Sequence, residues 1–537
     1  GDPIEIDFAE PASVAKDKAA RVELAADQIK GGNRRHVNMK VTLPGKTKFA
    51  LSEDDVPMPD NWENWFAWNA DGKSSKDSLI DMSGWLDAPA GTHGRVTRRG
   101  GDLFYNGKKQ KFWGVNLTFG NTAPDNWLAE KRAKLYARYG VNAVRLHKFA
   151  EGHTWNGILS SKSATQYNPD KLDKMDYFIH QLKQKGIYTK LSAVFGGVPV
   201  GPDDRNRIDF FDDLKKKSDG WRGAPQGALW FSDGLQQILI DQMVNVLDHK
   251  NPYTGMRYAD DPAIMYVEII NENSVFFYTT IKALKNISKV REMAGKDFYR
   301  WLKQKYGSRE AWIQSWGKGA VNSFSNEGLS GESWDKGIIY PAGNPWYYDP
   351  KQLEGKMEGR KQRLLDTMNY LYEKQLNFYK RFATAVRKTG YDGELIGSNW
   401  QAGSGYSHFL NLHTDATVGT IDRHNYYSGT GSMMQNPGGG MLSTGMQQVK
   451  DRPFMLSEWI HVFPNPFRLE GPAIIGAYGM GLNDWDVSYL FQNKDNGSFR
   501  DKRGKDKWEI TTPQIMGMFP AVARQVLRED VSPADKT

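Results

Sequence analysis

The chain has 537 residues, of which 39% are hydrophobic and 25% charged, so it can bury a large core, which argues against wholesale disorder. It contains no cysteine, which excludes disulfides, thiolate metal sites and cysteine nucleophiles. The net charge of +8 favours an anionic partner, but the basic residues are spread along the chain and no nucleic-acid-binding motif occurs. No apolar run approaches the ~18 residues of a membrane-spanning helix.

Residues 1–95 are predicted to form an irregular extension with a small β component. The stretch is polar and rich in Gly, Asp and Pro, and short strands are expected around 36–42 and 48–51. Its first residues, Gly1-Asp2-Pro3, show no basic and apolar leader, so either a signal peptide has been removed or none existed. We expect the former, with a secreted or periplasmic protein.

From about residue 100, short apolar runs typical of buried strands alternate with amphipathic helices that end at glycines. Examples are the helices predicted at 125–139 before Gly140 and at 170–185 before Gly186. Eight candidate strands lie near residues 112, 141, 187, 264, 394, 418, 453 and 480. Eight parallel strands with intervening helices predict an α/β fold, a (β/α)8 TIM barrel over residues 96–530.

The segment at about 273–356 is too long for a loop, so it is predicted to be an insertion after strand four. Helices of its own are expected at 296–306 and 309–316. A doubly wound sheet is the alternative architecture, but the chain has no glycine-rich first turn that would anchor a nucleotide.

Two of the predicted strands end in a glutamate. Glu272 follows the run 264–271, and Glu458 follows the run 453–457. The carboxyl ends of the strands form the face of a parallel barrel where chemistry takes place. Two carboxylates on this rim are the minimum equipment for cleaving a glycosidic bond. Either glutamate alone could be a surface or salt-bridge carboxylate, but the pair together with Asn271 favours catalysis.

An ordered set of polar and aromatic residues accompanies the two glutamates at predicted strand ends. The set comprises Arg145 and His147 on strand two, Asn271-Glu272 on strand four, His424-Asn425-Tyr426 on strand six, Glu458 on strand seven and Trp485 on strand eight. Over about residues 100–525 the chain therefore resembles clan A of the retaining glycoside hydrolases. The stretches 112–117, 140–147 and 251–255 resemble cellulase-like bacterial enzymes of marine polysaccharide degraders, such as β-carrageenase- or agarase-type endo-β-galactanases.

This resemblance implies a double displacement. Glu458 would attack the anomeric carbon and Glu272 would be the general acid and base, with the carboxylates ~5–5.5 Å apart. Arg145 would hold the nucleophile, and Tyr426 would steady its charge. Asn271 would bond the sugar 2-hydroxyl.

The resemblance also implies that His147 and His424 bind substrate and that Trp485 forms the floor of a sugar subsite. For each of the three, a purely structural place in the core is the alternative. Glu268, four residues before Glu272 on the same strand face, is expected to be structural.

Cations near the predicted rim indicate a charged polysaccharide. Lys148 follows His147, Arg423 precedes His424, and Arg205 and Arg207 come after strand three. Arg and Lys bind sulfate and carboxylate directly, so a sulfated or otherwise anionic galactan of the red-algal type is expected, with ordinary surface charge as the alternative. Aromatic residues expected to build stacking subsites are Trp155, Trp221, Trp230, Trp346, Trp400 and Trp459.

Such subsites favour a retaining endo-β-glycosidase, although the insertion could also wall off the cleft and make the enzyme exo-acting. The alternatives are a β-mannanase or β-glucanase, an exo-β-galactosidase, and a non-catalytic carbohydrate-binding barrel. The last would typically have lost one of the two glutamates. The expected partner is a polysaccharide or oligosaccharide, without nucleic acid or membrane, and the sequence does not fix the oligomeric state.

No cofactor and no metal are expected. The chain has no His-x-x-x-His pattern, and the paired Asp484 and Asp486 are more typical of surface aspartates than of a calcium site. The segment Gly403-Ser404-Gly405 lacks the five-residue elbow of serine hydrolases.

Overall fold

The computed structural model describes residues 78–401, 405–428, 431–436, 438–462, 465–499 and 508–535, together with four short strands nearer the N-terminus. These strands are β1 (Glu5–Phe8), β2 (Ser13–Lys16), β3 (Ala20–Glu23) and β4 (Met39–Thr42), and they pair as β1 with β4 and β2 with β3, both antiparallel. Strand β4 lies within the range predicted at 36–42, whereas the strand predicted at 48–51 lies outside the described residues.

The chain divides into two compact units, Gly1–Asn69 and Ala70–Thr537. The division falls before the boundary predicted at residue 95, because residues 78–95 bond to the barrel helices. The backbone N–H of Met82 donates to Arg138 and that of Ala90 donates to Lys183.

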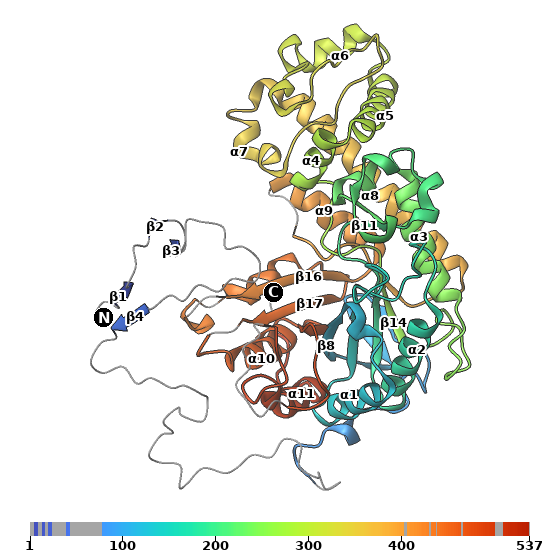
Figure 1. Ribbon diagram of the computed structural model, residues 1–537, viewed down its shortest axis with the longest axis vertical. Helices are drawn as coiled ribbons and strands as arrows, with labels where there is room; N and C mark the ends of the chain where they lie inside the picture. Colours follow the sequence, from blue (N-terminus) through green and yellow to red (C-terminus); the bar gives the residue numbers. More distant parts are fainter. Residues whose placement is uncertain are drawn as a thin grey trace. The chain divides into compact units, whose positions relative to one another are not determined.

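Eight parallel strands form one sheet in the second unit, in the order β15-β14-β10-β9-β8-β18-β17-β16 (Figure 1). No hydrogen bonds join the two outer strands of that order among the described residues, so the barrel is nearly closed. The predicted (β/α)8 barrel is confirmed. The strands are β8 (Phe112–Thr118), β9 (Ala143–His147), β10 (Tyr188–Ser192), β14 (Ile264–Glu268), β15 (Glu394–Ile396), β16 (Ile421–Tyr427), β17 (Phe454–His461) and β18 (Val487–Phe491).

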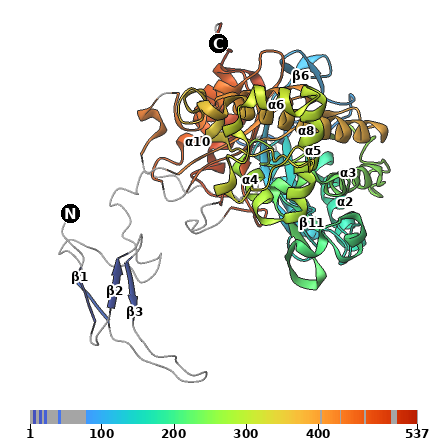
Figure 2. The same cartoon turned by 90° about the horizontal axis from the view of Figure 1, so that it is seen from above.

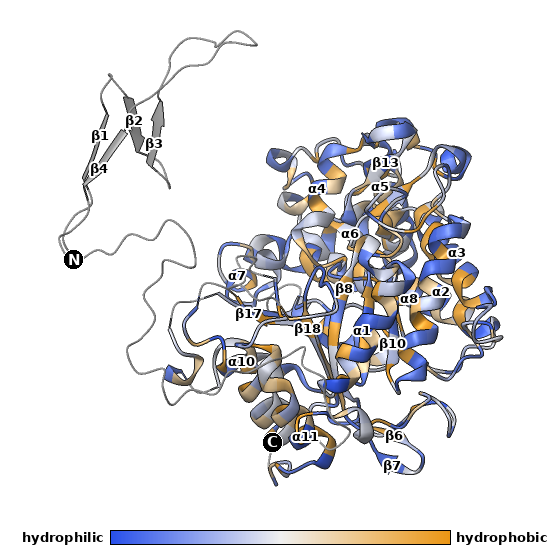
Figure 3. Cartoon of the chain, turned by 60° about the horizontal axis from the view of Figure 1, so that its bottom comes forward, coloured by the Kyte–Doolittle hydropathy of each residue, from blue (hydrophilic) through white to orange (hydrophobic). Residues whose placement is uncertain are grey.

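Helices follow the strands and cover the outside of the sheet. They are α1 (Asn126–Arg138), α2 (Pro169–Gln184), α3 (Asp233–Asp248), α8 (Lys361–Lys388), α9 (Gly405–Val418), α10 (Glu470–Ile474) and α11 (Phe519–Arg528). Helix α2 begins where the Asn168 side chain accepts a hydrogen bond from the Lys171 N–H, and Pro169 occupies its first position. Figure 3 shows hydrophobic and hydrophilic residues on the same helices, as expected for helices with one face on a core.

The eighth strand is the one that the sequence misplaced. It was predicted at 478–485, but α10 continues there as a π-helical segment, Ile475–Leu482, and the strand follows at Val487–Phe491. The segment packs closely because of its glycines: a Cβ on Gly476 would lie 2.5 Å from Val522 of α11. An apolar run of this length fits a buried helix as well as a buried strand, so the sequence pattern could not distinguish the two structures.

A small hairpin sheet covers the amino end of the barrel. It consists of β5 (Thr97–Arg99), β6 (Asp102–Tyr105) and β7 (Lys108–Lys109). Its buried Leu103 and Tyr105 join one hydrophobic cluster with residues from the beginnings of the barrel strands, such as Phe112 and Tyr188. The amino end is thus filled, and the carboxyl end carries the polar residues described below.

The insertion lies between β14 and β15, as predicted. It contains α4 (Tyr278–Asn286), α5 (Ser288–Tyr306), α6 (Arg309–Trp316) and α7 (Pro350–Leu353), which Figure 1 shows grouped above the barrel. In Figure 2, which is seen from above, α4, α5 and α6 lie in front of it. A buried ion pair between Glu332 and Arg363, 2.6 Å apart, ties the insertion to α8. A further small sheet, β11 (Val198–Val200), β12 (Lys215–Lys216) and β13 (Arg222–Ala224), follows β10.

None of the helices in the described part of the chain is long and apolar enough to cross a bilayer.

Candidate active site

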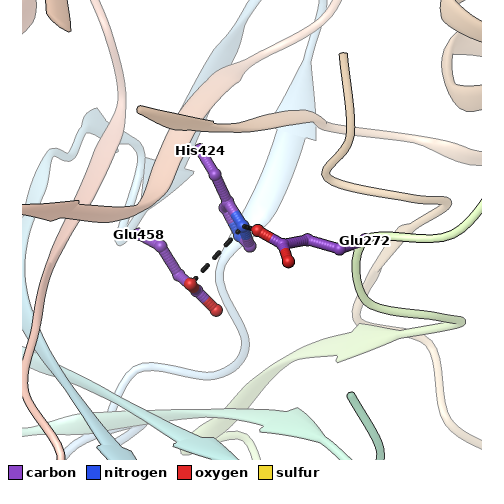
Figure 4. A group of neighbouring side chains, drawn as sticks. All are labelled: Glu272, His424 and Glu458. Carbon is purple, nitrogen blue, oxygen red and sulfur yellow. Dashed lines mark hydrogen bonds and ion pairs between the residues drawn. The ribbon is translucent and has the colours of Figure 1, made fainter. Parts of the chain in front are cut away.

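Glu272 and Glu458 face each other at the carboxyl end of the barrel, beyond β14 and on β17 (Figure 4). One carboxylate oxygen of each, together with a ring nitrogen of His424, lie within 4.8 Å of one another. The Glu272 side chain is 22% exposed and the Glu458 side chain 5%. One carboxyl group is therefore open to solvent, and the other is enclosed.

Glu458 is surrounded by hydrogen-bond donors. Arg145 Nη1 donates to one carboxylate oxygen over 2.6 Å, and the Tyr426 hydroxyl donates to the other over 2.5 Å. His147 Nε2 lies 3.3 Å from the same oxygen as Arg145. Burial alone would raise the pKa of Glu458, but the charges of His424 and Arg145 and the Tyr426 hydrogen bond outweigh it and hold the pKa below its usual value. The Glu458 carboxylate is thus kept ionised.

Glu272 is held in an unusual backbone conformation. Its φ of 41° lies in the left-handed region, where a side chain is disfavoured. Its N–H donates to Asn399 Oδ1 over 2.7 Å, which secures this conformation from the end of the neighbouring strand. Its carboxylate lies 2.8 Å from His424 Nδ1, and the other ring nitrogen of His424 lies 3.0 Å from Ser457 Oγ.

Arg145 connects the rim to an ion network below it. Nη2 donates to Asn271 Oδ1 over 2.7 Å and to both oxygens of Glu268 over 3.0 Å. Lys190 pairs with Glu268 at 2.9 Å and with Asp422 at 2.5 Å. Burial would raise the pKa of Glu268, but Arg145 and Lys190 outweigh it and lower the pKa. Glu268 is therefore bound within the barrel, in line with the structural place expected for it.

Asn271 has an unused donor. Its Oδ1 accepts from Arg145 and, over 3.2 Å, from Asn399 Nδ2, which fixes the orientation of the amide. Its buried Nδ2 has no hydrogen-bond partner among the described residues. Since a buried donor without a partner is costly, this group is suited to a ligand oxygen.

The chain is similar in sequence to two plant mannan endo-1,4-beta-mannosidases. No protein-family model matches the chain. It is 23% identical to mannan endo-1,4-beta-mannosidase 1 of Arabidopsis thaliana over 257 residues, 47% of this chain and 54% of the relative. It is 24% identical to the putative mannan endo-1,4-beta-mannosidase 9 of Oryza sativa subsp. japonica over 255 residues, 46% of this chain and 52% of the relative. The chain spans about half the length of these relatives.

The similarity to these glycoside hydrolases is in line with the predicted resemblance to clan A. Among solved structures, the beta-galactosidase from Bacillus circulans sp. alkalophilus superimposes with a TM-score of 0.50 at 15% identity, over 78% of this chain and 56% of that one. This likeness supports the barrel fold.

Several aromatic residues predicted for the clan A cleft lie elsewhere. Trp459 is fully buried, donates to Ser488 Oγ over 2.9 Å and packs on Trp113, because successive residues of β17 face opposite sides of the sheet. Trp485 is fully buried ahead of β18 and packs on Phe454 at the beginning of β17, which is the opposite end of the barrel from Glu458. Trp221 and Trp230 are also buried. The aromatic residues of the prediction that do reach the surface are Trp155, Trp346 and the partly exposed Trp400.

Three of the four cations predicted for substrate binding are paired with aspartates. Arg423 is fully buried against Asp415, Arg205 pairs with Asp212, and Arg207 pairs with Asp241.

Lys148 differs from these three cations. Its Nζ lies 4.8 Å from the ring centre of Phe119 and 4.4 Å from that of Phe195, and burial lowers its pKa. It also lies within the electrostatic influence of Glu458 and Glu272. Lys148 therefore remains as the cation of the predicted set beside the carboxylate pair.

Sequence reasoning missed several residues that shape the site. Asn116 accepts from Arg145 Nη1 over 3.1 Å, and Ser192 bonds both Arg145 and His147. Asn399 could have been found, because it follows strand five as Asn271 follows strand four. Trp508 could not, since it lies outside every predicted strand, yet its ring centre is 5.4 Å from that of Tyr426.

The spacing of Glu272, His424 and Glu458 would also suit a metal ion. Both oxygens of Glu458, however, already accept hydrogen bonds, one of them from the Arg145 guanidinium. A cation there would meet the positive charges of Arg145 and Lys148, so the donor set fits a pair of reacting carboxyl groups better than a metal.

Proposed function

We propose that the chain is a retaining β-glycosidase that cleaves a β-linked polysaccharide at internal bonds. The observation that carries the proposal is the pair of carboxylate oxygens of Glu272 and Glu458 within 4.8 Å of each other. Retaining enzymes need about 5–5.5 Å between carboxyl groups, whereas inverting enzymes need about 6.5–9.5 Å to admit a water.

In the first step, Glu458 attacks the anomeric carbon while Glu272 gives its proton to the glycosidic oxygen, and the bond to the leaving sugar breaks. In the second step, water attacks the glycosyl ester, Glu272 takes a proton from it, and the Glu458 carboxylate is released. Arg145 and Tyr426 keep Glu458 ionised between turnovers. The unused Nδ2 of Asn271 would bond the sugar 2-hydroxyl.

The proposed substrate is an anionic, sulfated galactan. The support for this choice is Lys148, held between Phe119 and Phe195 beside both carboxylates, because an ammonium group at the rim would bind a sulfate on the sugar. A β-1,4-mannan is the second candidate, favoured by the names of the two plant relatives. Since such polysaccharides lie outside the cell, the proposal includes export of the enzyme.

The first test is hydrolysis of a panel of polymers by the full chain. Agarose, porphyran, κ-carrageenan, mannan, xylan and mixed-linkage glucan would be assayed for new reducing ends, and the anomer released first would be read by NMR. We expect cleavage of one polymer with retention of the β configuration. Glu458→Gln abolishes cleavage, and Glu272→Gln lowers it by about 10²–10⁴-fold, the usual contribution of a general acid.

An activated aryl glycoside separates the two roles. Its leaving group departs without a proton, so Glu272→Gln is expected to form the glycosyl ester from it at close to the wild-type rate, whereas Glu458→Gln stays inactive. Lys148→Met tests the anionic substrate: it should weaken cleavage of the sulfated polymer by a larger factor than cleavage of the desulfated polymer, with the exposed Lys216→Met as control. Binding without cleavage of any substrate would instead support a non-catalytic barrel.

A further inference from the structure

Four aromatic rings form a continuous row from the carboxylate pair onto the insertion. The ring centres of Trp400 and Phe277 are 4.4 Å apart, those of Phe277 and Tyr278 4.4 Å, and those of Tyr278 and Trp346 6.5 Å. We call this row the aromatic ridge. Trp400 follows β15, whereas the other three residues belong to the insertion.

The rings of the ridge are not used to build the core. Tyr278 is 44% and Trp346 59% exposed, and Phe277 and Trp400 are partly exposed. Single exposed aromatic residues are ordinary, but four in mutual contact form an apolar surface that favours a binding partner. Aromatic faces suit the apolar C–H faces of sugar rings, while the Tyr and Trp polar atoms can bond the hydroxyls.

The inner end of the ridge is fixed to the candidate active site. Asn399, the residue before Trp400, accepts from the Glu272 N–H and donates to Asn271. Gln401, the residue after it, donates to the backbone oxygen of His424 over 3.1 Å. Trp400 is therefore held between two residues that bond the surroundings of Glu272, the proposed general acid.

We infer that the aromatic ridge binds the sugar units on the leaving-group side of the cleaved bond. This inference rests on the proposed function, in which Glu272 protonates the leaving oxygen, so that the units beyond it belong to the leaving part. Another exposed aromatic pair, Phe119 after β8 with Trp155 after β9, lies on a different side of the barrel, since β10 separates β9 from β14. The insertion thus extends the cleft instead of closing it.

A bound acceptor on the ridge gives the chain a second activity, glycosyl transfer. A hydroxyl oxygen of an oligosaccharide on the ridge attacks the anomeric carbon of the glycosyl ester in place of water. Its proton passes to Glu272, the bond from the anomeric carbon to Glu458 breaks, and a new glycosidic bond forms. Because the ridge raises the local concentration of acceptor, transfer competes with hydrolysis.

The test compares the full chain with the variants Tyr278→Ala, Trp346→Ala and the double variant. The matched control is Trp127→Ala, since Trp127 on α1 is 61% exposed and lies outside the ridge. The substrates are the polymer cleaved in the panel above and an aryl glycoside of the same sugar. At about 0.5–1.5 kcal/mol for each of the two aromatic contacts, the double variant should raise KM for the polymer about 5–150-fold.

The ratio of transfer to hydrolysis, measured with added oligosaccharide acceptor, should fall in the double variant by a similar factor. Its hydrolysis of the aryl glycoside, which has no sugar units beyond the cleaved bond, should fall by a smaller factor than its hydrolysis of the polymer. The Trp127→Ala control should match wild type throughout. An unchanged KM for the polymer together with an unchanged transfer ratio would overturn the inference.

A binding measurement keeps the inference separate from the proposed function. In affinity electrophoresis against the panel polymers, the Glu458→Gln chain should be retarded, and adding both ridge substitutions should abolish the retardation. If wild type cleaves no substrate but this loss of retardation is seen, the proposed function fails and the ridge remains a sugar-binding surface. Equal retardation with and without the ridge substitutions would reject the ridge, whatever the hydrolysis assays give.

Discussion

Arg145 is the residue on which the contacts of the candidate active site converge. Its guanidinium donates to the rim residues Glu458 and Asn271 and to Glu268 below them. A planar group with several donors can serve these acceptors at fixed angles, which the single ammonium of a lysine cannot. Arg145 therefore sets the position of the proposed nucleophile and of the amide that would bond the sugar.

The Tyr426 hydroxyl gives a prediction about pH. Its hydrogen bond helps to hold the pKa of Glu458 low, so Tyr426→Phe should raise that pKa. Glu458 must be ionised to react, and the acid limb of the kcat/KM profile is therefore expected to move to higher pH. At optimal pH, kcat/KM should fall about 10–100-fold, as for the loss of a hydrogen bond to a charged group.

Tyr427→Phe is the matched control, because its hydroxyl bonds the backbone oxygen of Gly431 and not Glu458. Its pH profile should coincide with that of wild type. An acid limb that stays in place in Tyr426→Phe would assign that limb to another group.

The sequence predicted the carboxylate pair and their polar neighbours because each stands at a strand end, where the barrel fold alone brings them together. It was less successful with the tryptophans, since composition does not show whether a tryptophan is buried in the core or exposed for stacking on a sugar. The position of Trp459 outside the cleft could nevertheless have been predicted, because a residue next to Glu458 on a strand must face the other side of the sheet. The contact of Trp508 with Tyr426 could not have been predicted, because no local sequence pattern marks the position of Trp508.

Among the elements, the insertion is held to the barrel helix α8 by a buried ion pair. Glu332 and Arg363 are fully buried, and Glu332 also accepts the backbone N–H groups of Asn322 and Tyr340. A buried pair of this kind contributes little net stability when intact, but removing one partner leaves a charge without compensation.

Glu332→Gln is therefore expected to loosen the insertion by about 3–5 kcal/mol, the usual effect of breaking a buried pair. Hydrogen exchange should increase around residues 318–340 and at the beginning of α8, while the barrel strands stay protected. The exposed Glu292→Gln, which removes only surface pairs with Lys296 and Lys289, should change neither. A uniform loss of protection against hydrogen exchange across the barrel would show that the ion pair does not act on the insertion alone.

Among the elements, the sequence predicted seven of the strands and two helices of the insertion, α5 and α6, because the hydrophobic period and the glycine stops were unambiguous there. It failed at strand eight. The segment Ile475–Leu482 is apolar on all sides and lies against α11, so no polar face remained to reveal its helical period.

For the whole molecule, every strand of the barrel sheet and every residue of the candidate site belong to the unit Ala70–Thr537. A chain that begins at Ala70 should therefore keep the melting temperature of the barrel and hydrolyse an aryl glycoside within about twofold of the full chain. Thermal unfolding followed by circular dichroism and the aryl glycoside assay would check this.

A second truncation provides the contrast. A chain that begins at Gly107 lacks Leu103 and Tyr105, which fill the amino end of the barrel, and should unfold at a lower temperature or fail to fold. If both truncations behaved alike, the hairpin sheet would not be part of the barrel core.

The left-handed backbone conformation of Glu272 means that the residue needed for activity is not the residue that gives the highest stability. A glutamate at this φ is disfavoured by about 1–2 kcal/mol, and asparagine tolerates the conformation better. Glu272→Asn is therefore expected to melt at a higher temperature than wild type while losing hydrolysis of the polymer. A library screened for heat resistance alone would drift away from glutamate here, and only a screen that also demands turnover would retain it.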